Sequence, residues 1–525
     1  MAKNGNVRKE NFKNLNISPL DKLKRRKGKI LDTFSGAGLG AINHPASWID
    51  ECVPNILWAV LVVSSIDRME YLDVFRRLIE NCFENLPKRK ELHITHNFLS
   101  VASEDEFDVM MKPILADKRL HETLSTLLAI ETLPDRKHWE RHLKLGDKGA
   151  ALRQLAAAIA DVFDHQSEKS TDIRWLKTLY VVCCRDQLTF DISLKDKIKE
   201  IVDFPNFGQQ EQVRPSIRAL ELGLRQIEFQ LEDAEKHWPA GRQKMAIYNS
   251  EAFWQQMFND APCLVLSEYP SQETAPADVL EEISRLADVV SDHYMKTITT
   301  TKADPRHEAA FGLALYAIQL ALISGSLGHS QTDGRVTLRT IVETFILLRY
   351  LTQEDNETLW LQYRKYGAGQ TKLAFLKYMK QENLPDFIDL AELHRIANED
   401  RWMEFQDIDL GHWAGANLRK MAELAAVKDV YDKYYDWTSG FVHGQWASTR
   451  STVFVNCLNP LHRYHVVPSS SVLQMPSVLP DACKLINRMI DDLNSLYPTL
   501  KMRLSAYKVM TEPEPNEKIQ VVAVK

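Results

Sequence analysis

Apolar residues recur at intervals of three and four along several long segments of the chain, a period typical of amphipathic α-helices. The clearest such segments are Tyr71–Leu86, Ala151–Asp164, Ile217–Glu235, Val279–Tyr294, Leu338–Leu351 and Val427–Trp446. Alternating, β-like patterns are short and occur at Thr452–Val455 and Ile519–Val524. The sequence therefore predicts an all-α protein of multi-helix bundles with at most minor β-structure, built by helix-on-helix packing.

Changes in composition along the chain predict its domain organisation. The predicted parts are a basic flexible arm (1–29), an N-terminal helical domain (30–240), a linker or loop region (241–278), a C-terminal helical domain (279–500) and a tail (501–525). Within the arm, Lys22–Lys29 carries six basic residues in eight positions. We expect this arm to be a solubilising segment, although such a cluster can also attract nucleic acid or anionic lipid.

The charge balance limits the classes of protein that the chain can belong to. Its 525 residues include 65 Lys plus Arg and 71 Asp plus Glu, which gives a net charge of −6 and excludes a histone-like polycation. Any contact with nucleic acid must therefore be local. The 45% of hydrophobic residues argues against global disorder.

One stretch, Ala309–Thr332, has no Asp, Glu, Lys or Arg and is long enough to span a membrane. It is rich in Ala, Gly and Ser and has Gln319 near its middle, so we expect a buried core helix and no membrane contact. The seven cysteines form no CxxC pair, and an odd number of scattered thiols is typical of a reducing compartment. We therefore expect a cytoplasmic protein.

The first candidate site lies in an apolar helix that carries two arginines and a glutamate. Arg339 and Glu343 are four residues apart, so they lie on one helical face, and Arg335 lies one turn earlier. One interpretation is a structural ion pair between bundle helices. The other is an arginine that contacts phosphate, with Arg335 as a further RNA contact and Glu343 orienting Arg339.

A second candidate site repeats every four residues, at Tyr431, Tyr435, Ser439 and His443. On a helix these residues would form one polar and aromatic stripe. Gly440 and Gly444 would leave the backbone open to another chain or a ligand. His443 is the best general acid or base, because imidazole titrates near neutral pH, but a hydrogen-bonded histidine between helices is the simpler interpretation.

Between these two sites, Trp360–Lys380 mixes basic and aromatic residues in a way that suits RNA binding. The candidate RNA contacts here are Arg364, Lys365, Lys372 and Tyr366, and the alternative is a helix–turn–helix with a solvated basic face. No sequence pattern with convincing metal-ligand spacing appears, and the His462 and His465 pair lies in a turn-rich segment. We therefore expect no metal and no cofactor.

Four segments together resemble an uncharacterised bacterial domain family of unknown function, mainly over residues 280–500. They are the Arg339–Glu343 helix, WLQYRKYG, SGFVHG (Ser439–Gly444) and NPLHRYH (Asn459–His465). The same region distantly resembles the HEPN superfamily of helical bundles, many of which are metal-independent endoribonucleases in antiphage and toxin systems. Those nucleases carry an Arg that is followed by four to six residues and then by a His. His443 matches the histidine, but that spacing holds no Arg here, so Arg339 would have to act from another helix.

The resemblance implies a metal-independent endoribonuclease, as an antiphage defence or toxin effector. His443 would move protons at the ribose 2′-OH or the leaving oxygen, and Arg339 would stabilise charge on the phosphate. Ser439 and Tyr435 would orient His443, and Glu343 would hold Arg339. The partner would be RNA, and the family analogy implies a homodimer.

A second hypothesis is a non-catalytic helical protein that serves as a binding module, sensor or scaffold. It accounts directly for the missing Arg-to-His spacing. In this case the N-terminal domain, residues 30–240, would bind a protein partner. The sequence leaves both hypotheses open.

Overall fold

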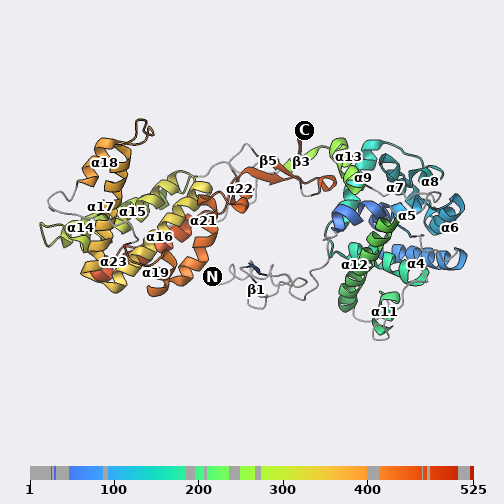
Figure 1. Ribbon diagram of the computed structural model, residues 1–525, viewed down its shortest axis with the longest axis horizontal. Helices are drawn as coiled ribbons and strands as arrows, with labels where there is room; N and C mark the ends of the chain where they lie inside the picture. The colour runs from blue at the N-terminus through green and yellow to red at the C-terminus, as the bar shows by residue number, and fades with distance from the viewer. Residues whose placement is uncertain are drawn as a thin grey trace. The chain divides into compact units, whose positions relative to one another are not determined.

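The chain forms two compact units, which are coloured from blue to green and from green to red in Figure 1. The N-terminal unit comprises Met1–Pro262 and Leu458–Arg463, and the C-terminal unit comprises Cys263–Cys457 and Tyr464–Lys525. The computed structural model describes residues 25–26, 29–30, 47–86, 93–184, 195–205, 210–235, 249–266, 274–398, 408, 413–463, 465–469, 473–505 and 521–524. Most of the basic arm lies outside this part of the chain. The division between the units falls within the predicted linker region, where helix α13 (Ser250–Asp260) also forms.

The N-terminal unit is built from helices around a continuous apolar core. Its elements are η2 (Trp48–Cys52), η3 (Pro54–Ile56), α3 (Leu57–Ser65), α4 (Arg68–Asn85), α5 (His96–Leu99), α6 (Glu104–Leu115), α7 (Arg119–Ser125), η4 (Thr126–Ala129), α8 (Arg136–Glu140), α9 (Lys148–Val162), α10 (Glu168–Cys184), α11 (Lys195–Val202), α12 (Gln210–Glu235), α13 and η7 (Pro460–His462). Helix α3 is apolar on every side and is buried from Leu57 to Val63. An all-apolar helix needs cover on all faces, and α7 and α9 pack against α3.

The C-terminal unit is a second helical bundle. Its helices are α14 (Ala277–Thr297), α15 (Pro305–Ser326), α16 (Thr332–Glu354), α17 (Glu357–Tyr378), α18 (Leu390–Ala397), α19 (Leu418–Leu424), α20 (Lys428–Val430), η6 (Tyr431–Tyr435), α21 (Asp436–Val442), α22 (Trp446–Val453) and α23 (Leu479–Leu496). Helix α15 packs against α14, α16 and α23, and α16 also packs against α23 (Figure 1). Their facing side chains form the core of this unit.

The strands are short and pair in twos. In the basic arm, β1 (Arg25–Arg26) pairs with β2 (Lys29–Ile30). In the C-terminal unit, β3 (Cys263–Leu266) pairs antiparallel with β6 (Val521–Val524), with Cys263 opposite Val524. Strand β4 (Phe454–Asn456) likewise pairs with β5 (Val466–Pro468). The predicted all-α class with minor β-structure is confirmed.

The predicted single helix over Val427–Trp446 is confirmed from Lys428 to Val442 and is wrong beyond Val442. The chain forms α20, a π-helical turn at η6 and then α21, which ends at Val442. The helix stops because Gly444 adopts φ +58°, and the Gln445 N–H donates to the Gly440 carbonyl at 3.0 Å. This is a Schellman motif, which suits a glycine in the left-handed conformation.

Helix α15 is the described helix that is long and apolar enough to cross a membrane, judged by length and composition. Half of its most apolar window is buried within the protein. Ala310, Phe311, Ala314, Ala317 and Ile318 are buried in the C-terminal core. The packing of α15 against three neighbouring helices accounts for its apolar character.

Two glycines on adjacent helices provide a test of this packing. A Cβ at Gly334 in α16 would lie 2.6 Å from the His329 carbonyl oxygen, whereas a Cβ at Gly312 in α15 would meet no atom within 4 Å. We expect Gly334→Ala to lower the free energy of unfolding by about 1–3 kcal/mol, because the backbone must shift. Gly312→Ala should raise it by up to about 1 kcal/mol. Urea denaturation measures both, and equal effects would contradict the predicted packing.

Candidate functional site

The structure brings together three of the predicted site residues, Arg339, Glu343 and Tyr435. Arg339 Nη1 donates to Glu343 Oε1 along α16, and the Arg339 guanidinium carbon lies 3.5 Å from the centroid of the Tyr435 ring. The Arg339 side chain is 10% exposed, while that of Glu343 is 41% exposed. Tyr435 in turn stacks on Tyr431, with ring centroids 4.3 Å apart. Because α16 packs against η6 and α21, the arginine helix contacts the segment that leads to His443.

Arg335, one turn earlier on α16, binds backbone carbonyls. Its Nη1 donates to the Gln331 carbonyl at 3.2 Å, and its Nη2 donates to the Pro476 carbonyl at 2.6 Å. Burial lowers the pKa of Arg335 to about 10. These bonds tie the start of α16 to the segment before α23, so Arg335 is placed as a structural residue.

His443 lies at the end of α21 and is exposed. Its backbone N–H donates to the Ser439 carbonyl at 3.1 Å. Within the described residues, the His443 imidazole makes no hydrogen bond to Ser439, Tyr435 or Arg339. The π-turn at η6 and the helix end at Val442 interrupt the stripe that a regular helix would have formed.

Gly440 accommodates a helix of the same chain. A Cβ at Gly440 would lie 2.7 Å from Ser448 Oγ of α22, so the glycine permits α21 and α22 to pack closely. On these two helices Trp437 is 58% exposed and Trp446 is 68% exposed. Aromatic side chains are enriched where proteins bind a partner. The segment around His443 therefore offers aromatic rings as well as an imidazole.

Two of the predicted RNA contacts, Arg364 and Lys365, line a cavity of about 380 Å³ at the starts of α15 and α17. Lys302 and Arg306 also line it, so four cationic side chains face two carboxylates, Asp304 and Glu357. Arg306 forms a bidentate pair with Asp355, at 2.7 and 2.8 Å, and Arg364 pairs with Glu308 at 3.2 Å. Lys302 and Lys365 form no ion pair among the described residues.

Sequence reasoning missed Lys302 and Arg306, because Lys302 precedes α15 and Arg306 lies in its first turn, while the predicted basic segment lies on α17. The remaining predicted contacts, Tyr366 and Lys372, lie further along α17 and do not line the cavity. Helix α17 runs without a break through Gly367 and Gly369, so the helix–turn–helix alternative for this segment is wrong. Gly369 is buried against Ile408, whose Cγ2 would be 3.6 Å from an added Cβ.

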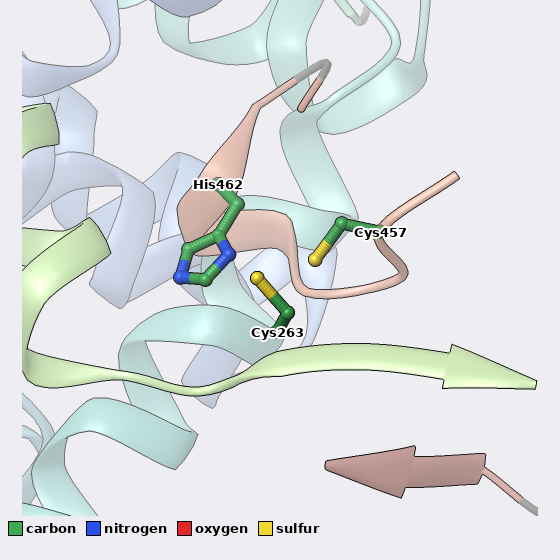
Figure 2. Close-up of side chains that lie close together, drawn as sticks. All are labelled: Cys263, Cys457 and His462. Atoms are coloured by element: carbon green, nitrogen blue, oxygen red, sulfur yellow. The ribbon is translucent and has the colours of Figure 1, made fainter. Parts of the chain in front are cut away.

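Figure 2 shows one group of possible metal ligands, Cys263, Cys457 and His462, whose donor atoms all lie within 4.8 Å of one another. Burial and the neighbouring Cys457 thiol raise the pKa of Cys263. Three donors are one fewer than the four that close a structural zinc site. The group by itself therefore does not define a metal centre. Its cysteines are far apart in sequence and lack the spacing by which zinc motifs are recognised.

One comparison with known proteins matches part of the chain to a domain family, and none of the comparisons indicates an activity. Residues 314–459 match the model of a family of unknown function, DUF5677. The matched stretch includes Arg339, Glu343, Tyr435, Ser439 and His443. No curated protein and no solved structure matches the chain. The expected likeness to an uncharacterised domain family is thus supported, whereas the likeness to HEPN proteins is not shown by any of these comparisons.

The contacts of Arg339 predict which of its two partners, Tyr435 or Glu343, contributes more to the free energy of unfolding. We expect Tyr435→Leu to lower the free energy of unfolding by about 1–2 kcal/mol, because it removes a partly desolvated cation–π contact. Glu343→Gln should cost less than about 1 kcal/mol, because this carboxylate is largely in water. Chemical denaturation compares the two variants, with the half-exposed Tyr316→Leu as a control for loss of a tyrosine. A larger effect from Glu343→Gln would contradict the ranking.

Proposed function

We propose that the C-terminal unit binds RNA, and that the cationic cavity between the starts of α15 and α17 contacts the phosphate backbone. The observation that carries this proposal is the excess of lysine and arginine around the cavity. Lys302 and Lys365 remain available for a phosphate, because the described residues offer them no carboxylate partner. Arg306 and Arg364 also line the cavity, but the carboxylates of Asp355 and Glu308 balance their charges and hold the two side chains in place.

The exposed aromatic residues support RNA over a small anion. Trp437 and Trp446 are more than half exposed, and indole rings are good platforms for unpaired bases. Single-stranded RNA offers both phosphates and free base faces. A protein that is acidic overall can bind it only through such local features.

The binding proposal predicts a measurable loss of affinity when the free lysines are removed. In fluorescence anisotropy with a labelled single-stranded RNA, Lys302→Ala combined with Lys365→Ala should weaken binding about tenfold. The slope of log K against log salt should fall by roughly 0.7 for each lost phosphate contact. Both changes follow because fewer counterions are released on binding.

Lys484→Ala is the matched control, because this lysine is 57% exposed on α23 and does not line the cavity. The RNA affinity and the salt slope of this variant should equal those of the wild type. Absence of RNA binding by the wild type would overturn the proposal. Equal losses in the control and the cavity variants would place the contact elsewhere.

A second candidate function is metal-independent RNA cleavage, as in HEPN-like endoribonucleases. Two observations favour it. His443 is exposed, so RNA can reach its imidazole, and Arg339 lies on α16, which packs against η6 and α21, the segment that leads to His443. In this proposal His443 takes the proton from the ribose 2′-OH, whose oxygen attacks phosphorus and expels the 5′ oxygen, and the 5′ oxygen takes a proton from water. Arg339, held by Glu343 and Tyr435, stabilises the negative charge on the phosphate.

Cleavage is tested with purified protein and single-stranded RNA in excess EDTA. We expect wild-type protein to produce ends with 2′,3′-cyclic phosphate, and His443→Ala to be slower by at least about a hundredfold, because the general base is lost. His394→Ala removes another exposed imidazole, on α18, and should cleave at the wild-type rate. Unchanged cleavage by His443→Ala would exclude this role for His443. RNA binding without cleavage would leave a non-catalytic binding protein.

A further inference from the structure

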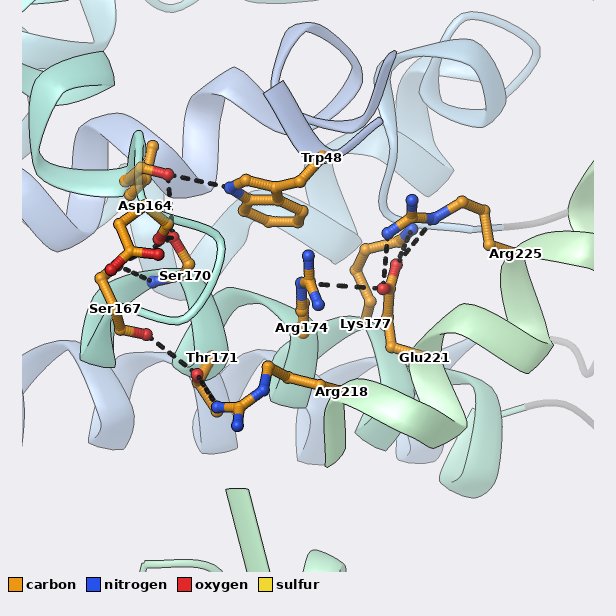
Figure 3. A network of polar contacts seen from close by, with 11 residues as sticks. Trp48, Asp164, Ser167, Ser170, Thr171, Arg174, Lys177, Arg218, Glu221 and Arg225 are labelled. Carbon is orange, nitrogen blue, oxygen red and sulfur yellow. Dashed lines mark hydrogen bonds and ion pairs between the residues drawn. The ribbon is translucent and has the colours of Figure 1, made fainter. Parts of the chain in front are cut away.

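A group of buried charged residues lies in the N-terminal unit, between helices α10 and α12 (Figure 3). Arg174 and Lys177 come from α10, and Glu221 and Arg225 come from α12. Each of these four residues is at most 6% exposed. Among the described residues, these three cations lie around the carboxylate of Glu221 in the interior, where an uncompensated charge is costly.

Glu221 is fully engaged by two of the three cations. Lys177 Nζ donates to Glu221 Oε1 at 3.1 Å, and Arg225 Nη2 donates to Glu221 Oε2 at 2.7 Å. Burial acts to raise the pKa of Glu221, but Lys177, Arg225 and Arg174 together lower it below its ordinary value. The carboxylate is thus ionised, and its two oxygens are already committed.

Arg174 is the cation with the weakest contacts in this group. Its Nε lies 3.8 Å from Glu221 Oε2, which is too long for a hydrogen bond, and this Nε has no hydrogen-bond partner in the described structure. Figure 3 shows the guanidinium between the carboxylate and the ring of Trp48, and its carbon lies 4.5 Å from the ring centroid. Burial lowers the pKa of Arg174. The side chain is held in place, but its donors are not used.

Arg218, one turn before Glu221 on α12, adds a further positive charge. Its Nη1 donates to Thr171 Oγ1 at 3.3 Å, a neutral partner on α10. Burial and then Arg214 lower the pKa of Arg218, and Arg218 also acts to lower that of Arg174. Thr171 lies one turn before Arg174 on α10, so this hydrogen bond places Arg218 beside the part of α10 that carries Arg174.

We propose that Arg174, together with Arg218, binds the phosphate group of a small ligand on the N-terminal unit. A phosphate would accept hydrogen bonds from the unused fork of Arg174 and would bring negative charge to a guanidinium that has no hydrogen-bonded carboxylate in the described structure. Only Nε of Arg174 is both enclosed and unpartnered, so its terminal Nη groups retain access to solvent. The proposal is independent of the RNA-binding function proposed for the C-terminal unit.

Equilibrium dialysis of the full chain with radiolabelled inorganic phosphate, at ionic strength kept constant with NaCl, tests this proposal. Wild-type protein should bind phosphate in a saturable manner. Arg174→Met, which keeps the length of the side chain but removes its charge, should weaken that binding by at least about tenfold. Circular dichroism verifies that the variant is folded. If Arg174→Met does not fold, Arg174→Lys is used, which keeps the charge but loses the planar fork and should also bind more weakly.

Lys365→Ala is the matched control, because it removes one positive charge from the cavity of the C-terminal unit. It should leave the Arg174-dependent binding unchanged, which separates this site from the proposed RNA site. No saturable binding by the wild type, or equal binding by wild type and Arg174→Met, would show that the network is purely structural and would overturn the proposal.

The same experiment with adenosine monophosphate identifies the source of the phosphate. Binding at least about tenfold tighter than that of inorganic phosphate, and lost in Arg174→Met, would indicate a nucleotide. Equal affinities would indicate that the phosphate group alone is recognised. Both results support a phosphate site at Arg174.

Discussion

The burial of helix α16 is the constraint on which the C-terminal unit depends. This helix is covered by α15, α23 and the segment η6–α21, yet it carries Arg335 and Arg339. A buried guanidinium must be satisfied, since leaving it without partners would cost several kcal/mol. Arg335 therefore binds carbonyls of the loop before α16 and the segment before α23, and Arg339 binds Glu343 and Tyr435. The two arginines connect segments that the apolar core alone would orient less specifically.

The N-terminal unit must also compensate buried cationic side chains, but it does so with other partners. Helix α10 is buried for most of its length and also carries two cations, Arg174 and Lys177. Here the compensation comes mainly from the single carboxylate of Glu221, which Lys177 and Arg225 already occupy. In the C-terminal unit, backbone carbonyls bind Arg335, and Glu343 together with the Tyr435 ring binds Arg339. In the N-terminal unit, Arg174 keeps a buried Nε without a hydrogen-bond partner in the described structure, which is the feature behind the proposed phosphate site.

Candidate functional groups in the C-terminal unit lie mainly at the ends of helices. The cavity residues Lys302 and Arg306 lie at the start of α15, and His443 lies just beyond the end of α21. Helix interiors in this bundle are committed to packing, as Gly440 shows by its close approach to Ser448. The ends leave side chains exposed while the rigid helices fix their positions. This arrangement is suited to binding a long, charged polymer across several short contacts.

Local periodicity by itself determined the helices, because a helical repeat places apolar residues on one face whatever the rest of the chain does. It also determined the pairing of Arg339 with Glu343, since residues four apart are neighbours on any helix. It failed at Val427–Trp446, where a π-turn and a left-handed Gly444 interrupt a pattern that reads as continuous.

Tertiary structure alone decided which groups meet. Tyr435 lies over Arg339, and Lys302 faces the same cavity as Lys365, although the members of each pair are far apart in sequence. The contacts of Lys177 with Glu221 likewise depend on the packing of α10 against α12. Hydrophobic spacing specifies which face of a helix is buried, but the partner on that face depends on the packing of segments remote in sequence.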